Sequence, residues 1–138
     1  DGTLMLNIRA KPVRRVAFSS DGGATWTGLR DEPLLPDPGN NGAIVRFAAD
    51  AAPNDPHAHW LLFSNTESST ARVNLTVKLS CDDGQHWPVR RVIEPGAAAY
   101  STLTMLPDGR VALLYEGDDY KNITLAIFAP SWLGAGCP

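Results

Sequence analysis

Short apolar runs, separated by clusters of Gly, Pro, Asp and Asn, constrain the fold of this chain most strongly. The runs are continuously apolar or alternate with a period of two residues, and helical periodicity is almost absent. Breakers such as "PDPGNNG" and "CDDGQ" lie between them. The sequence therefore predicts an all-β protein of antiparallel strands joined as hairpins, with one weak signal for a short helix in "APSWLGAG". The nine candidate strands are residues 3–10, 13–20, 42–49, 59–66, 73–80, 88–95, 99–106, 110–117 and 122–129.

Length and composition fit one modest hydrophobic core. The chain has 138 residues, of which 43% are hydrophobic, enough for a single globular unit. A net charge of -3 gives no basic face, so nucleic acid is not expected as a partner. No apolar run approaches about 18 residues, so no membrane span is expected. The start at Asp1, without Met and directly before a strand, suggests a processed or truncated chain.

An eight-residue turn motif occurs twice. "SSDGGATW" occupies residues 19–26 and "SCDDGQHW" residues 80–87, so both read Ser-x-Asp-x-Gly-x-x-Trp and both follow an apolar strand. Such a repeat, with several strands per unit, is typical of β-propeller blades. The Asp can accept backbone N–H groups across the turn, the Gly supplies a positive φ, and the Trp can cover the turn. Asp21 and Asp82 are therefore interpreted as structural residues, and not as a catalytic pair.

The hairpin around the turn "PDG" places two polar residues at one end. Tyr100 lies eight residues before Asp108 in the turn "PDG", and Glu116 lies eight residues after it. Residues equidistant from a hairpin turn are cross-strand neighbours, within one residue of register. Tyr100 and Glu116 should therefore lie together at the end away from the turn, either as an ordinary frayed end or as part of a site.

The remaining arginines are less distinctive. Arg14 and Arg15 are adjacent in one strand, as are Arg90 and Arg91 in another, so the two side chains of each pair point to opposite faces of a sheet. We interpret all four as solvated charges. Arg46, in the middle of a predicted strand, is the main competitor for a place in a functional site.

Cysteine and histidine give weaker signals. Cys81 and Cys137 could form a disulfide in a secreted protein, or could be two buried thiols, because their spacing says nothing about their distance. His57 and His59 would share one face of an extended segment, but no further ligand cluster supports a metal site, and no cofactor is expected. The acidic segment 116–120, "EGDDY", is interpreted as a solvated turn.

Taken in order along the chain, these segments resemble sialidases (neuraminidases), in particular those of bacterial, actinobacterial type. "DGTLMLNIRA" with "RRVAFSSDGGATW" resembles the segment that places an arginine at a strand end before an Asp box. "LLFSNTESSTARVNLTVKLSCDDGQHW" resembles the segment with a second arginine before a later Asp box. "AYSTLTMLPDGRVALLYE" resembles the segment with the nucleophilic tyrosine and a glutamate one strand later. The resemblance covers nearly the whole chain and implies two to three C-terminal blades of a six-bladed propeller, secreted from the cell.

The resemblance also implies roles for four residues. Arg9 and Arg72 would bind the carboxylate of sialic acid, which suits the planar fork of a guanidinium group. Tyr100 would attack the anomeric carbon, because a neutral phenol avoids the repulsion that a carboxylate nucleophile would meet there. Glu116 would orient an arginine of the triad. A phenol with a pKa near 10 also needs a nearby base.

A polar segment could form the rim of the same pocket. "PDPGNNGAIVRF", residues 36–47, matches a small polar turn that precedes a strand in the family. Asn40 and Asn41 are candidates to contact the glycerol or N-acyl side chain of the sugar.

In the family, the activating glutamate, the general acid/base aspartate and a third arginine would precede Asp1. Residues 1–138 alone are therefore expected to be inactive, and to need the remainder of the propeller or self-association to cover their open blades. The main hypothesis is an exo-sialidase that acts on sialylated glycans by retaining hydrolysis. The alternative is a non-catalytic Asp-box module that binds glycans or proteins. Only an enzyme has reason to gather Arg9, Arg72, Tyr100 and Glu116 at the end opposite the Asp boxes.

Overall fold

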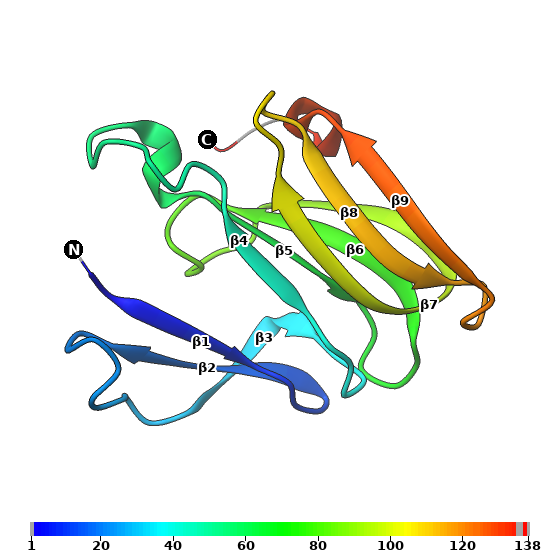
Figure 1. The fold of residues 1–138 in the computed structure, drawn as a ribbon. Coiled ribbons are helices and arrows are strands. Elements are labelled where there is room, and N and C mark those ends of the chain that lie inside the picture. The colour runs from blue at the N-terminus through cyan, green and yellow to red at the C-terminus, as the bar shows by residue number, and fades with distance from the viewer. Residues whose placement is uncertain (1, 135–136, 138) are drawn as a thin grey trace.

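A computed structural model describes residues 2–134 and 137, and these form an all-β, antiparallel structure. Figure 1 shows a small sheet beside a larger, strongly curled one. The all-β class and the antiparallel β-propeller blades predicted from the sequence are confirmed. The elements are β1 (Leu4–Ile8), β2 (Val13–Ser19), β3 (Arg30–Pro36), β4 (Ala43–Arg46), the 3-10 helix η1 (Pro56–His59), β5 (Leu61–Thr66), β6 (Val73–Ser80), β7 (Val89–Met105), β8 (Val111–Gly117), β9 (Asn122–Phe128) and the 3-10 helix η2 (Pro130–Leu133).

Neighbouring strands in the sheets follow the order of the chain. The small sheet has the order β1-β2-β3, and the large one β4-β5-β6-β7-β8-β9, with every neighbouring pair antiparallel. β7 is 17 residues long, and it pairs with β6 through its first part and with β8 through its second. Figure 1 shows this long strand crossing from one part of the curled sheet to the other. It therefore joins two successive blades without a turn.

The predicted strands agree with the structure except at two places. The runs 88–95 and 99–106 form the single strand β7, because the Gly-Ala-Ala segment between them stays extended. β3 was not predicted, since its sequence "RDEPLLP" contains two prolines and no apolar alternation. A proline lacks the N–H for a strand ladder, and β3 tolerates it as the edge strand of its sheet. The expected short C-terminal helix is present as η2, and residues 135–136 of that segment lie outside the described part.

Two apolar clusters hold the sheets together. Leu62, Leu75, Val77 and Leu113 of the large sheet are fully buried, and each contributes about 1.5–3 kcal/mol by leaving water. A second cluster contains Leu35, Leu61, Phe63 and Trp87, with Met5 of β1 packed against it. The second cluster draws on both sheets, and so fixes the small sheet against the large one.

The first copy of the repeated motif forms a hydrogen-bonded turn. Asp21 Oδ1 accepts from Thr25 N at 2.9 Å, and Ser19 Oγ accepts from Gly23 N at 2.9 Å. Gly23 has a φ of +94°, a backbone conformation that favours glycine. Trp26 donates its ring N–H to Gly23 O at 3.0 Å. The Asp side chain is thus used to close the turn, which agrees with its structural interpretation.

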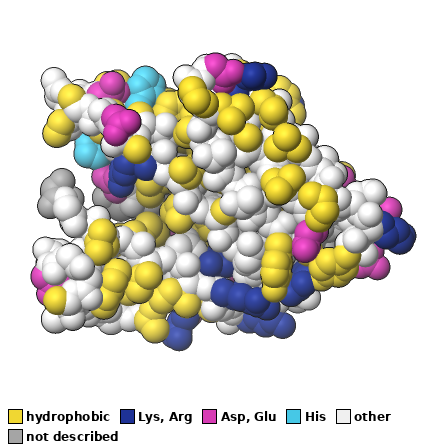
Figure 2. Space-filling model, in the orientation of Figure 1, with side chains coloured by type: hydrophobic (Ala, Val, Ile, Leu, Met, Phe, Trp, Pro, Cys, Tyr) yellow, Lys and Arg dark blue, Asp and Glu magenta, His cyan; other side chains and the backbone are white. Residues whose placement is uncertain are grey.

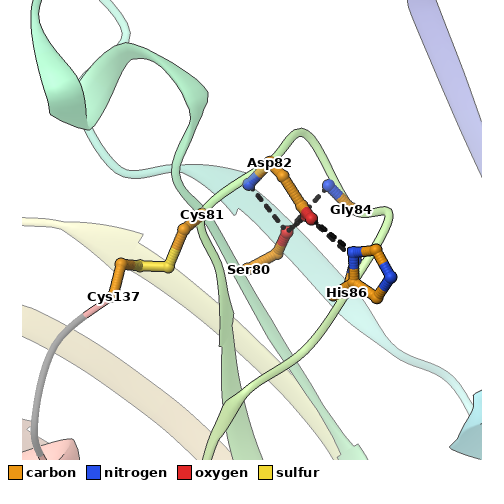
Figure 3. Close-up of a disulfide and its surroundings, with 6 residues drawn as sticks. All are labelled: Ser80, Cys81, Asp82, Gly84, His86 and Cys137. Carbon is orange, nitrogen blue, oxygen red and sulfur yellow. Dashed lines mark hydrogen bonds and ion pairs between the residues drawn. A yellow bond between two sulfur atoms is a disulfide. The ribbon is translucent and has the colours of Figure 1, made fainter.

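The second copy repeats the Asp and Ser hydrogen bonds of the first, beside a disulfide (Figure 3). Asp82 Oδ1 accepts from His86 N at 2.9 Å, and Ser80 Oγ accepts from Gly84 N at 2.8 Å. Cys81, between the Ser and the Asp of this turn, is bonded to Cys137, with 5.8 Å between their Cα atoms. Of the two alternatives that the spacing left open, the structure therefore shows the disulfide, and it ties the C-terminal segment to the second Asp box.

The outer blades expose apolar side chains. Ile123, Leu125 and Ile127 alternate along the edge strand β9 and are exposed, and Leu4 and Leu6 are exposed on the edge strand β1. Sheet faces of this kind are usually covered by other protein. Within the described residues, no helix is long and apolar enough to cross a membrane.

Candidate functional site

The two candidate arginines lie at strand ends on the side away from the Asp boxes. Arg9 follows the last residue of β1, and Arg72 precedes the first residue of β6. The Asp boxes begin at Ser19 and Ser80, which are the last residues of β2 and β6. Since β1 and β2 are antiparallel and Leu4 pairs with Ser19, Arg9 is at the opposite end of that sheet from its Asp box. Figure 2 shows Lys and Arg side chains gathered along the lower part of the face, away from the His side chains at its upper left.

Tyr100 lies between these two arginines. Arg9 Nη1 donates a hydrogen bond to the Tyr100 hydroxyl at 3.3 Å. The Arg72 guanidinium carbon lies 5.3 Å from the centre of the Tyr100 ring, within the range of a cation–π contact. Tyr100 is 41% exposed, and its hydrogen bond with Arg9 lies at the surface. Folding therefore brings together Arg9, Arg72 and Tyr100, although Arg72 and Tyr100 lie 63 and 91 positions after Arg9 in the sequence.

The arginines change the acidity of this phenol. The hydrogen bond and the positive charge of Arg9, followed by the smaller effect of Arg72, lower the pKa of Tyr100 below its usual value of 10. A cation that stabilises the phenolate makes the oxygen a better nucleophile near neutral pH. The site thus combines an exposed phenol of lowered pKa with two positive charges.

Tyr120 also belongs to this site, and sequence reasoning missed it. Arg72 Nη1 donates to the Tyr120 hydroxyl, and this contact is the largest cause of the raised pKa of Arg72. Tyr120 lies in the turn between β8 and β9, in which Asp118, Asp119 and Tyr120 all have positive φ. The sequence analysis interpreted residues 116–120 as a solvated turn. An acidic run between two strands does not indicate that the tyrosine at its end contacts an arginine.

Glu116 supports the backbone of Tyr100. Tyr100 N donates to Glu116 Oε2 at 3.0 Å, which confirms that the two residues are cross-strand neighbours at this end of the hairpin. The register between β7 and β8 shifts between Ala98 and Ser101, so the carboxylate replaces a regular ladder partner. Among the ion pairs of the described residues, none joins Glu116 to an arginine, and its expected role in orienting one stays a prediction.

Asn40 and Asn41 lie beside Tyr100, but their side chains are directed at the backbone of β7. Asn40 is fully buried, and its Nδ2 donates to Ala99 O at 2.9 Å and to Thr66 Oγ1 at 3.0 Å. Its expected contact with the sugar stays a prediction, and in this structure the Asn40 side chain is buried and bonded to protein groups. Asn41 is half-buried and exchanges two hydrogen bonds with the peptide groups of Ser101, both at 3.0 Å.

The interpretation of Arg14 as a solvated charge is wrong. Arg14 is 3% exposed and forms an ion pair with Asp37 Oδ2 at 2.9 Å, and Asp37 is fully buried. Its neighbour Arg15 behaves as expected and pairs with Asp31 on the surface. Arg46, the competitor for a functional role, pairs with Asp83 of the second Asp box at 2.9 Å. Its guanidinium group is therefore committed to the other end of the blade.

Two open hollows differ in their relation to this site. One, of about 280 Å³, lies beside Tyr100 and is lined in part by Asn41, Leu114, Glu116 and Ile123. A larger one, of about 600 Å³, lies on the Asp-box side, where its lining includes the Arg46–Asp83 pair. We assign the site by chemistry and not by size, because the larger hollow contains no candidate nucleophile. Among the described residues no group of three or more His, Cys, Asp or Glu is placed to hold a metal ion.

Comparison with known proteins gives this arrangement a family. Residues 1–113 match the model of the BNR repeat-like domain. The chain belongs to the BNR repeat-like domain family. This BNR repeat-like chain is 46% identical to a sialidase of Micromonospora viridifaciens over 99% of its own length, and 32% identical to a sialidase of Bacteroides fragilis over 83%.

Solved structures agree with these relatives. The Hadza microbial sialidase Hz136 superposes with a TM-score of 0.79 and 31% identity over 95% of this BNR repeat-like chain. The intramolecular trans-sialidase from Ruminococcus gnavus, solved with oseltamivir carboxylate, gives a TM-score of 0.80 at 20% identity, which shows the shared fold alone. The chain spans only 21% and 22% of the two bacterial relatives and 26% of the Hadza structure. It therefore corresponds to a partial region of a sialidase.

Proposed function

We propose that Arg9, Arg72 and Tyr100 form the nucleophile side of an exo-sialidase active site, which releases terminal sialic acid from glycoconjugates with retention of configuration. The observation that carries this proposal is the Tyr100 hydroxyl, exposed and held between two arginines from other strand ends. The sialidase relatives support it.

The two arginines suit the charge of the substrate. Sialic acid carries a carboxylate on its anomeric carbon, and a guanidinium group can bind a carboxylate through two parallel hydrogen bonds. Arg9 and Arg72 approach Tyr100 from different blades, so a carboxylate bound between them would place the anomeric carbon near the phenol oxygen. Tyr120 would hold Arg72 in place for this contact.

The proposed reaction would use this placement in two displacements. The Tyr100 oxygen attacks the anomeric carbon as the bond to the leaving glycosidic oxygen breaks, and the phenol proton passes to a base. An acid protonates the leaving oxygen. Water then attacks the same carbon, breaks the bond to Tyr100 and releases sialic acid, and two displacements give net retention.

Further groups are needed for this cycle. The cycle needs an acid for the leaving oxygen and a base for the phenol, and we assign neither role to a described residue around Tyr100. We therefore propose the activity for the protein in which residues 1–138 adjoin such groups, together with a third arginine. Glu116, whose side chain accepts a hydrogen bond from Tyr100 N, would orient that arginine.

Partners and location are part of the same proposal. The exposed apolar faces of β1 and β9 would be covered by further blades or by a second copy of the chain. The Cys81–Cys137 disulfide supports secretion, since disulfides persist in oxidising compartments.

A non-catalytic glycan- or protein-binding module is the second candidate, and the convergence on Tyr100 favours the enzyme. The test is hydrolysis of a fluorogenic sialoside by the full-length protein and by its Tyr100→Phe variant. We expect Tyr100→Phe to lower kcat by at least about 1,000-fold, and Tyr115→Phe, which removes a hydroxyl from the core, to stay near wild type. A Tyr100→Phe protein with wild-type activity, or a wild-type protein that binds sialosides without cleaving them, would contradict the proposal. Analysis of the product separates hydrolysis from intramolecular transfer.

A further inference from the structure

The peptide groups on both sides of Tyr100 are held by side chains from another loop. Asn40 Nδ2 donates to Ala99 O at 2.9 Å. Asn41 Nδ2 donates to Ser101 O, and Asn41 Oδ1 accepts from Ser101 N, both at 3.0 Å. These bonds lie where the register between β7 and β8 shifts. At this point Glu116 of β8 accepts from Tyr100 N, and the two asparagines bond the peptide groups of Ala99 and Ser101 on either side of it.

The loop that carries both asparagines has a fixed shape. Asp37 Oδ1 accepts from Gly39 N at 2.7 Å and from Asn40 N at 2.6 Å. Gly39 has a φ of +82°, and a Cβ atom there would meet the Lys11 side chain at 2.5 Å. A buried carboxylate and a required glycine therefore set the direction in which the asparagine side chains point.

A buried arginine connects this loop to the strand of Arg9. Arg14 Nη1 donates to Asp37 Oδ2 at 2.9 Å and to Asn40 O at 3.1 Å. Its Nη2 donates to Asn7 O at 3.1 Å, and Asn7 lies on β1, two residues before Arg9. One guanidinium group thus contacts both the strand that ends at Arg9 and the loop that holds the backbone of Tyr100.

We propose that the segment Asp37–Asn41, anchored by Arg14, is a brace that sets the Tyr100 hydroxyl against Arg9, with Asn41 as its positioning residue. The inference rests on the proposed function for its catalytic meaning, but the brace itself is a claim about geometry. Asn41 acts through the peptide groups of Ser101 and does not need to touch substrate.

The site has little tolerance for movement of this strand. The Arg9–Tyr100 hydrogen bond is already 3.3 Å long, and such a bond weakens steeply with further distance or misalignment. A misplacement of about 1 Å at a reacting group can cost about 100-fold in rate. Loss of the two Asn41 bonds frees Ser101 to shift, and Tyr100 with it.

The first test reads the position of Tyr100 without substrate. Tyrosines are labelled with ¹³C at Cζ in the protein, which has three of them in residues 1–138, and the Tyr100 signal is assigned by its loss in Tyr100→Phe. We expect Asn41→Ala to move the pKa of Tyr100 up toward that of free tyrosine, because the phenol moves away from Arg9. Asn54→Ala, at an exposed loop residue, is the matched control and should leave the titration unchanged. A Tyr100 titration unaltered in a folded Asn41→Ala protein would overturn the inference.

Two further readouts keep the test decisive. If Asn41→Ala does not fold, the fallback measurement is hydrogen exchange of the Ser101 N–H in the wild-type protein. The brace predicts that this N–H is strongly protected, and rapid exchange would refute the brace. In the full-length protein, Asn41→Ala should lower kcat on a sialoside by about 10- to 100-fold, with KM within about 3-fold. A wild-type protein without sialidase activity would refute the proposed function. The Tyr100 titration in Asn41→Ala would then still test whether the brace positions Tyr100.

Discussion

Removing one charge of the Arg14–Asp37 pair should cost much of the stability of the fold. The two groups lie 2.9 Å apart, at 3% and 0% exposure. In Arg14→Met the stem of the side chain stays beside the Phe63 ring, but Asp37 is left as a buried charge without its cation. In Asp37→Asn the side-chain oxygen can still accept from Gly39 N and Asn40 N, but Arg14 is left unpaired.

The magnitude of this loss of stability follows from the burial of the ion pair. Breaking a buried ion pair by removing one partner costs about 3–5 kcal/mol, out of a total stability of about 5–15 kcal/mol for a domain. With an unfolding entropy of about 2.1 cal/mol/K per residue, 138 residues give about 0.29 kcal/mol/K. Each single variant should therefore lower Tm by about 10–17 °C. The double variant, in which no charge is left buried, should cost at least about 2 kcal/mol less than the sum of the two single variants.

The assay is urea denaturation of the wild type, both single variants and the double variant, with thermal unfolding as a second measure. Arg15→Met, which removes an exposed partner of Asp31, is the control, and it should change stability by less than about 1 kcal/mol. Two results would refute the claim that the pair is buried and coupled. One is a single variant that loses less than about 1 kcal/mol of stability. The other is a double variant whose loss of stability equals the sum of the losses of the two single variants.

Three further predictions concern the disulfide, the site and the Asp box. The disulfide joins residues 56 positions apart, so its reduction should cost about 4 kcal/mol, and an unchanged urea midpoint under reducing conditions would contradict the structure. Arg9→Met should raise the pKa of Tyr100 toward its usual value, as read by ¹³C NMR, because the main cause of the lowered value is removed; no change would show that the contact is absent in solution. Hydrogen bonds, first from the Thr25 hydroxyl, lower the pKa of Asp21 from 3.8 to about 2. Its ionised form therefore stabilises the fold above about pH 4, and this contribution is lost as the pH falls toward 2. Asp21→Asn should flatten the acid side of the curve of stability against pH, and a curve that matches wild type would contradict this assignment.

The strands and the pairing of Tyr100 with Glu116 were predictable because they depend on local patterns. Apolar alternation and turn residues define most strands, and equal distance from the "PDG" turn places the two polar residues together. The segment β3 was not predictable in this way, since its prolines and acids resemble a loop, and only its edge position lets it pair.

Contacts between distant segments could not be read from the sequence. Arg14 and Arg15 are adjacent and chemically the same, and only the fold buries one and exposes the other. The burial of Asn40 was missed for a similar reason, because a polar loop residue was assumed to face solvent. Tyr120 joins the site through a turn of three positive-φ residues, and no periodicity in the sequence indicates where such a turn directs a side chain.

The most direct test of the central claim is to identify the atom that bonds to the sugar. A sialic acid with fluorine at C2 as leaving group and at C3 to slow the second step should form a stable adduct with the full-length protein, which peptide mass spectrometry can locate. The account predicts one sialyl group on the Tyr100 oxygen, absent in Tyr100→Phe and retained in Tyr115→Phe. An adduct on a carboxylate side chain, or turnover that inverts the anomeric centre, would contradict it.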